Sequence, residues 1–120
     1  MKIYESAENY LETILILSQN NKAVRSIDIV NELEFAKPSV SVAMKNLRES
    51  GYIVMDDDGH ITLTKDGRKI AEMVYERHTV ISGWLVSLGV DKETAAKDAC
   101  RMEHAMSDKS FLAIKKHIGS

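Results

Sequence analysis

Three side chains that commonly bind transition metals lie within five residues near the end of the chain. Cys100, Glu103 and His104 stand at positions i, i+3 and i+4, so on a helix they share one face. A thiolate, a carboxylate and an imidazole on one face provide donors for a divalent metal ion. The alternative interpretation is structural, because a lone cysteine is often a small buried apolar residue and a Glu-His pair on a helix is usually solvated.

One helix cannot fill an octahedral coordination shell, so a metal centre here needs ligands from other segments. The candidates are His78, on an expected long helix, and Asn9 and Glu12, which lie three residues apart on an expected first helix. Spacing along the sequence does not show whether these groups converge. Both interpretations, a metal centre and an ordinary helix surface, therefore remain open on the residues alone.

The first half of the chain predicts two short helices followed by a β-hairpin. Ser26 is expected to cap a helix that ends near Leu33, and the next helix runs from Pro38 to Glu49, with proline at its first position. The dipeptide Asp58-Gly59 stands between two β-prone runs, which is the sequence signal of a hairpin. This order is typical of a winged helix-turn-helix, whose second helix enters the major groove of DNA.

The predicted recognition helix has polar residues that suit DNA. Lysine and arginine neutralise phosphates, and serine hydroxyls bond to phosphates or bases. The acidic run at residues 56–58 is a poor partner for phosphates, so either the hairpin tip stays off DNA or only its flanks touch it. His60, near that tip, is expected to be merely exposed. The candidate DNA contacts are Lys37, Pro38, Ser39, Ser41, Lys45 and Arg48.

The remaining segments are expected to be helical, and each begins at a residue that can cap a helix. Apolar side chains gather at the end of the long helix, which predicts a dimer contact through Trp84, Leu85, Val86 and Leu88, with burial in the monomer core as the alternative. The predicted helices run from Ser6 to about Gln19, from Thr64 to about Leu88, from Asp91 to about Met106 and from Ser107 to about His117.

Composition limits the classes of protein that the chain can belong to. It has 120 residues, of which 44% are hydrophobic and 28% charged, with a net charge of −2. This balance suits a folded domain and excludes intrinsic disorder. No apolar run approaches the roughly 18 residues that a membrane span needs, and no signal peptide is visible, so a cytoplasmic protein is expected. An acidic total does not exclude DNA binding, because local patches of charge decide it.

With these features, the chain resembles the diphtheria toxin repressor and manganese transport regulator family of metal-activated transcriptional repressors. The resemblance covers essentially the whole chain, and its last segment is the most specific. The matching segments are YLETI at 10–14, KPSVS at 37–41, LTKDGR at 63–68, YERH at 75–78, LGVD at 88–91 and DACRMEHAMSD at 98–108.

The resemblance implies a mainly α fold, with a winged-helix DNA-binding domain over residues 1–74 and metal-binding and dimerisation helices over residues 75–120. The SH3-like domain of larger members is not expected, since the chain ends at Ser120. His78, Cys100, Glu103 and His104 fall on family metal ligands. Glu12 matches a ligand of manganese-type members, and Asn9 stands where the family has Asp or Met.

Three positions depart from the family pattern. Ser82 and Ala96 stand at the ancillary metal site of diphtheria-type members, and neither can replace the usual acid and imidazole. Manganese-type members have Glu at the position of Cys100. The resemblance therefore implies a protein that combines features of both types: it has no SH3-like domain, it retains Glu12 of the manganese-type members, and it has a thiolate in the primary metal site.

The expected function is a cytoplasmic, non-enzymatic repressor that controls metal-ion homeostasis. Metal binding would lock a homodimer for a double-stranded operator, whose successive major grooves lie about 34 Å apart. The expected cofactor is Fe²⁺ or Mn²⁺, with Fe²⁺ favoured by the thiolate. Co²⁺, Ni²⁺ or Zn²⁺ can also bind in vitro, and no organic cofactor or membrane partner is expected. The runner-up is a winged-helix regulator without metal that senses oxidants through Cys100. A small metal-dependent hydrolase and a pure protein-interaction module are further alternatives.

Overall fold

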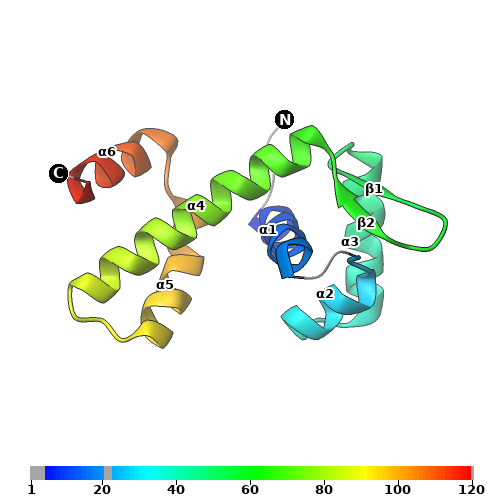
Figure 1. Ribbon diagram of the computed structural model, residues 1–120, viewed down its shortest axis with the longest axis horizontal. Helices are drawn as coiled ribbons and strands as arrows, with labels where there is room; N and C mark the ends of the chain where they lie inside the picture. The colour runs from blue at the N-terminus through cyan, green and yellow to red at the C-terminus, as the bar shows by residue number, and fades with distance from the viewer. Residues whose placement is uncertain (1–4, 21–22, 120) are drawn as a thin grey trace. The chain divides into compact units, whose positions relative to one another are not determined.

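The structure is a computed structural model that describes residues 5–20 and 23–119. The chain divides into two compact units between Glu72 and Met73, two residues before the boundary placed from the sequence. The expected architecture, mainly helical with one hairpin, is confirmed (Figure 1). The elements are α1 (Glu5–Asn20), α2 (Ser26–Leu33), α3 (Lys37–Glu49), β1 (Ile53–Met55), β2 (Ile61–Leu63), α4 (Lys65–Ser87), α5 (Lys92–Ala105) and α6 (Asp108–Ile118).

The first unit packs α1, α2, α3 and the hairpin around one apolar core. Leu11 and Ile14 from α1, Ile29 from α2, and Val40 and Met44 from α3 are almost fully buried there. The two helices of the helix-turn-helix, α2 and α3, pack against each other. The turn between them starts at Glu34, which adopts the left-handed conformation with φ 57° and donates its N–H to the Val30 carbonyl at 2.8 Å. α3 therefore keeps one face in the core and leaves the other exposed.

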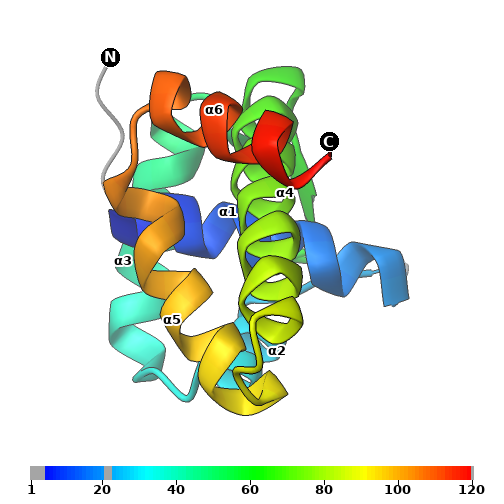
Figure 2. The ribbon, with the colours of Figure 1, turned by 90° about the vertical axis from the view of Figure 1, so that its left-hand side faces the viewer.

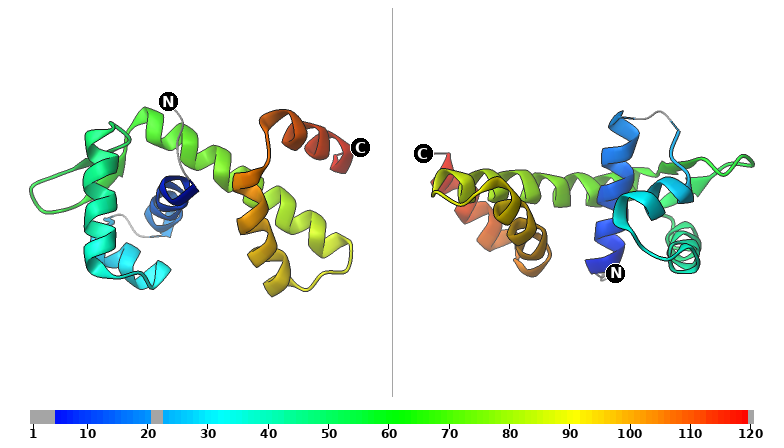
Figure 3. Two further views of the ribbon diagram at one scale, coloured as in Figure 1. Left: turned by 180° about the vertical axis from the view of Figure 1, so that it is seen from behind. Right: turned by 90° about the horizontal axis from the view of Figure 1, so that it is seen from below.

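The hairpin pairs β1 and β2 antiparallel, with Val54 opposite Thr62. Ile53 and Ile61 are buried at its base, and its loop projects away from the helices of this unit (Figure 3). Gly59, near the end of this loop, has φ +81°, which a residue with a side chain rarely adopts. The alternation of buried and exposed residues along the strands fixes the register of the wing.

Helix caps agree only partly with the sequence-based expectations. Asp91 and Ser107 cap α5 and α6 by accepting the N–H groups of Thr94 and Ser110. Thr64 Oγ1 likewise accepts the Gly67 N–H at 3.1 Å. Two predicted caps and one proline position are wrong. α2 is capped at Arg25, whose N–H bonds to the Asp28 carboxylate at 2.8 Å, rather than at Ser26. α1 begins before Ser6, and Pro38 is the second rather than the first residue of α3.

The second unit consists of the end of α4 together with α5 and α6, which lie beside it in Figure 2. Ile81, Ala99 and Phe111, one from each helix, form its buried core. Ala99 is fully buried, and an alanine lets two helices approach closely because its side chain is short. Within the described part of the chain, no helix combines the length and apolar character that crossing a membrane would require.

We expect Gly67→Ala to destabilise the first unit by about 1–3 kcal/mol, because a Cβ at this position would overlap the Tyr52 carbonyl oxygen. The matched control is Gly83→Ala in the same helix, where a Cβ would meet no atom within 4 Å. That substitution should stabilise the chain by up to about 1 kcal/mol. Urea unfolding of both variants tests the pair, and an equal stabilisation by both would contradict the close approach at Gly67.

Candidate metal centre and nucleic-acid interface

A buried stripe on α5 ends in a carboxylate. Ala95, Ala99 and Glu103 are four residues apart, and all three are buried. The first two are apolar, as a core-facing stripe requires, whereas the Glu103 side chain is completely inaccessible to solvent. Burial of an ionised carboxylate is costly unless cations or hydrogen-bond donors surround it. Glu103 is therefore the residue whose surroundings need a chemical explanation.

Two imidazoles contact the Glu103 carboxylate. His78 Nδ1 lies 3.0 Å from Oε2, and His104 Nε2 lies 3.3 Å from Oε1. The His104 side chain is only 3% exposed, and that of His78 is 29% exposed. Among the residues that the structure describes, Glu103 Oε1 has no hydrogen-bond partner of good geometry, which leaves a buried oxygen with unused capacity to bind a cation.

Cys100 completes a cluster of potential ligands within this unit. A ligand atom from each of Cys100, Glu103 and His104 lies within 4.8 Å of the other two. Cys100 is half-buried. The four donors, one sulfur, one carboxylate and two ring nitrogens, match the ligand chemistry of Fe²⁺, Mn²⁺, Co²⁺ or Zn²⁺. The residues present thus fit a divalent transition metal.

The structure brings together the four candidate ligands that belong to the second unit. Asn9 and Glu12, the other two sequence-based candidates, lie on α1 in the first unit. Glu12 is buried with 6% of its surface exposed, and Asn9 is half-buried. The Asn9 carbonyl accepts a hydrogen bond from Thr13 Oγ1 at 2.8 Å, as expected within a helix.

Arg77, which the sequence analysis did not single out, holds the junction between α5 and α6. Its guanidinium donates to the Glu103 carbonyl at 3.0 Å and to the Met106 carbonyl at 2.6 Å, and it pairs with the Asp108 carboxylate. The cation also lies 5.3 Å from the centre of the Phe111 ring, within the range of a cation–π interaction. Arg77 is only 4% exposed. It therefore fixes the backbone that carries Glu103.

The outward face of α3 carries every candidate DNA contact. Val40, Met44 and Leu47 are buried against the first core, so the helix can present only its opposite side to a ligand. All six predicted contact residues are exposed: Lys37, Pro38, Ser39, Ser41, Lys45 and Arg48.

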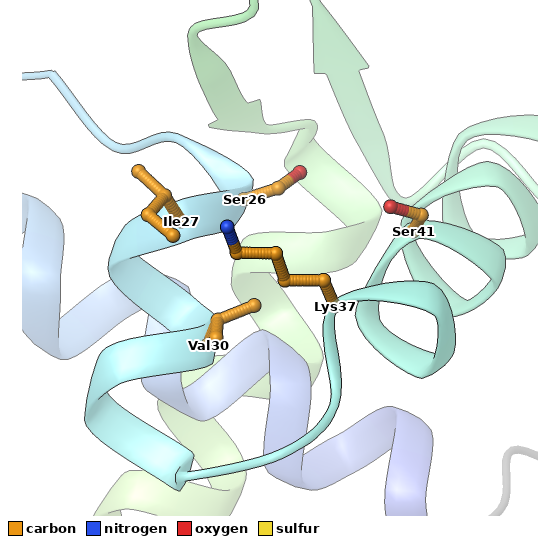
Figure 4. Close-up of a pocket in the computed structure, with 5 residues that line it drawn as sticks. All are labelled: Ser26, Ile27, Val30, Lys37 and Ser41. Atoms are coloured by element: carbon orange, nitrogen blue, oxygen red, sulfur yellow. The ribbon is translucent and has the colours of Figure 1, made fainter.

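A shallow pocket of about 210 Å³ lies where α2 meets α3. Figure 4 shows the Lys37 side chain reaching from the start of α3 across to α2, with the Ser26 and Ser41 hydroxyls both on one side of it. Ile27 and Val30 provide its apolar lining. Ser26 is a candidate that the sequence analysis missed as a binding residue, because it was interpreted as a helix cap.

In the acidic loop of the wing, residues 56–58, the Asp56 carboxylate contacts groups of the same loop. Asp56 accepts backbone hydrogen bonds from Asp58 at 2.9 Å and from His60 at 2.8 Å. The bond from the His60 backbone holds the pKa of the Asp56 carboxyl below its usual range. His60 is half-buried, and its ring nitrogens lie 3.3 Å from the Asp56 carboxylate and 3.2 Å from an Arg25 guanidinium nitrogen. The expectation that His60 is merely exposed is therefore wrong.

The predicted dimer residues differ in exposure. Leu88 is 64% exposed and Val86 is 38% exposed, whereas Trp84 is half-buried. Leu85 is also half-buried and packs against the second core, as the alternative interpretation expects.

A winged helix-turn-helix joined to a helical unit with a transition-metal ligand cluster defines a class of metal-dependent DNA-binding regulators. Two family models match the chain. The model "Iron dependent repressor, N-terminal DNA binding domain" matches residues 2–61, and "Iron dependent repressor, metal binding and dimerisation domain" matches residues 64–120. The chain therefore belongs to the iron-dependent repressor family, which comprises metal-dependent, DNA-binding transcriptional repressors rather than enzymes.

Individual relatives agree with this assignment. The chain is 34% identical over 113 residues to an HTH-type transcriptional regulator of Methanocaldococcus jannaschii, covering 92% of this chain and 90% of that protein. It is 33% identical over 119 residues to the transcriptional regulator MntR of Salmonella typhimurium, covering 97% and 76%. A solved structure described as a manganese-dependent transcriptional repressor in complex with manganese has a TM-score of 0.86 and 26% identity. The match covers 94% of this chain and 52% of the chain in that structure, so this chain spans about half of its length.

We expect Arg77→Met to destabilise the second unit by about 2–4 kcal/mol, because the Glu103 and Met106 carbonyls would lose their donor. Arg101→Met is the matched control, since Arg101 lies on α5 and is exposed; its effect should stay within about 0.5 kcal/mol. Urea unfolding measures both variants. Equal effects would show that Arg77 does not hold the junction.

Proposed function

We propose that this chain is a repressor whose binding to operator DNA as a homodimer depends on Fe²⁺ or Mn²⁺. The observation that carries the proposal is the Glu103 carboxylate, fully buried between His78 and His104 and beside Cys100. A buried carboxylate with imidazole and thiol neighbours is costly as a structural device alone, whereas a metal ion uses all four donors.

His78, Cys100, Glu103 and His104 would hold the cation. Four protein ligands leave positions open in an octahedral shell. We propose Glu12 of α1 as a further ligand, with Asn9 as another candidate from the same helix. A ligand from the first unit would make cation binding and the orientation of the DNA-binding unit depend on each other.

The Cys100 thiolate is the donor that favours Fe²⁺ over Mn²⁺. Carboxylate oxygens suit Mn²⁺, whereas the Cys100 thiolate shifts preference toward Fe²⁺, Co²⁺ and Zn²⁺. Zn²⁺ and Ni²⁺ bind such sites more tightly than Fe²⁺ or Mn²⁺ in vitro, so metal availability in the cell would select the physiological ion. The family model's iron dependence and the manganese-bound structural relative support these two metals.

DNA recognition would use the outward face of α3. Lys37, Lys45 and Arg48 would neutralise phosphates, Ser39 and Ser41 would bond to phosphates or bases, and Pro38 would lie against a base edge. The pocket at Lys37 and Ser26 would accept a backbone phosphate, because an ammonium group and hydroxyls converge there. Asp56 already accepts hydrogen bonds from the backbone of its own loop. This supports a wing tip that does not contact phosphates.

A homodimer would present two such helices to successive major grooves, about 34 Å apart. The exposed Leu88, with Trp84 and Leu85 beside it, would contribute to the contact between subunits. Cation binding would restrict the orientation of the two DNA-binding units, and DNA and metal would then each strengthen the binding of the other. Occupancy of the operator would repress genes of metal homeostasis.

We expect Mn²⁺, Fe²⁺ under anaerobic conditions, Co²⁺ and Zn²⁺ each to raise the melting temperature. A metal concentration 100 times Kd stabilises a folded protein by about 2.7 kcal/mol, which is several degrees for a chain of this size. Glu103→Gln should abolish the shift, because it removes the charge but keeps the shape. Glu93→Gln is the control, as Glu93 is exposed on the same helix, and it should retain the whole shift.

An unchanged melting temperature with all four metals would instead favour a regulator that works without metal.

A separate measurement tests whether the Cys100 thiol binds the metal. Co²⁺ bound through a thiolate shows a charge-transfer band in the near ultraviolet, so the wild type should show this band and Cys100→Ser should lose it.

We expect Arg48→Gln to weaken DNA binding and to reduce the slope of log K against log [salt] by about 0.9 for one lost phosphate contact. The duplex is selected from a random pool with Mn²⁺-loaded protein, and affinity is measured by fluorescence anisotropy at several salt concentrations. Lys97→Gln, at an exposed lysine of α5, should leave the slope unchanged. A slope equal in all three proteins would exclude Arg48 as a phosphate contact.

A further inference from the structure

The helix α3 exposes a large hydrophobic side chain, that of Val42. Val42 exposes 60% of its surface and is absent from the residues that pack against the first core. It follows the buried Val40 by two positions, and at about 3.6 residues per turn this places it on the opposite side of the helix. Val42 therefore points away from the core, near the middle of α3.

Local propensity does not explain a valine at this position. A β-branched residue forms helix less readily than alanine, lysine or glutamine, and exposure gives it no packing energy in return. Its χ1 angle is strongly restricted in a helix, so the two methyl groups are held in one direction. The helix thus presents a small, rigid apolar surface between Ser39 and Lys45, its neighbours one turn before and one turn after.

The surroundings of Val42 suit DNA better than a protein partner. Apart from Pro38 at its start, the exposed apolar area on α3 comes from Val42, and this area is far smaller than a protein interface. The helix also carries Lys37, Lys45 and Arg48 against one carboxylate, Glu49. A cationic helix with hydroxyls on its flanks and one apolar residue at its centre matches a major groove, whose apolar feature is the C5-methyl group of thymine.

We propose that Val42 is a specificity-determining residue that contacts the C5-methyl group of one thymine in each operator half-site, an inference that rests on the proposed DNA-binding function. Valine has no hydrogen-bonding group, so it cannot recognise the polar edges of bases. It distinguishes thymine from the other bases by apolar contact alone. The neighbouring serines and lysines remain free to contact phosphates or polar base edges.

Replacement of thymine by deoxyuridine tests the contact directly, because deoxyuridine keeps every hydrogen-bonding group and lacks only the methyl group. The duplex is selected from a random pool with the Mn²⁺-loaded full chain. Each thymine of a half-site is then replaced in turn, and affinity is measured by anisotropy at one salt concentration. At one position the wild type should lose about three- to fivefold in affinity, as expected for one buried methyl group.

Val42→Ala should bind thymine and deoxyuridine equally at that position, while the effects at other thymines remain. The matched control is Val54→Ala, which shortens another exposed valine of the same unit, on the wing, and should keep the three- to fivefold difference. Circular dichroism checks that both variants stay folded.

A thymine-to-deoxyuridine effect of the same size in the wild type and in Val42→Ala at every position overturns the inference but leaves the proposed function intact. Selection that yields no duplex bound by the metal-loaded protein overturns both.

Discussion

The buried carboxylate of Glu103 is the constraint around which the second unit is organised. Its position on the Ala95–Ala99 stripe forces it into the core, and an isolated carboxylate there would be prohibitively costly. Two imidazoles and a thiol approach the side chain, while Arg77 binds the backbone carbonyl of the same residue. Side chain and main chain are thus both held, which would keep the proposed ligand set in place before a cation binds.

Rigidity at this position has a thermodynamic consequence. A preorganised site loses little conformational entropy on binding, so more of the binding energy is available for coupling to a second ligand. Arg77 contributes because it ties the end of α5 to Asp108 at the start of α6. The buried guanidinium and the buried carboxylate therefore serve one purpose, which is to fix the helix end that bears Glu103 and His104.

The distribution of charge explains how a chain with a net charge of −2 fits a family of DNA-binding proteins. Cations gather on the exposed face of α3, whereas the acidic residues of the wing lie in a loop where Asp56 bonds to the backbone and to His60. Local fields, rather than the total, determine the approach of a polyanion. In the proposed mode of DNA binding, the acidic loop would disfavour contact by the wing tip, and recognition would fall to α3.

The sequence by itself determined the order of helices, the hairpin at Asp58-Gly59 and the shared helix face of Cys100, Glu103 and His104, because periodicity, turn residues and i, i+3, i+4 spacing are local properties of the chain. Tertiary packing alone decided that Glu103 is fully buried and that His78, 25 residues away, meets its carboxylate. It also decided the role of Arg77, which on sequence is an ordinary charged helix residue. The cap at Arg25 was missed for a different, local reason: the Asp28 carboxylate, three residues further on, accepts the Arg25 N–H, and the Ser26 hydroxyl does not act as the cap. Burial and convergence depend on which helices pack together, and local patterns do not contain that information.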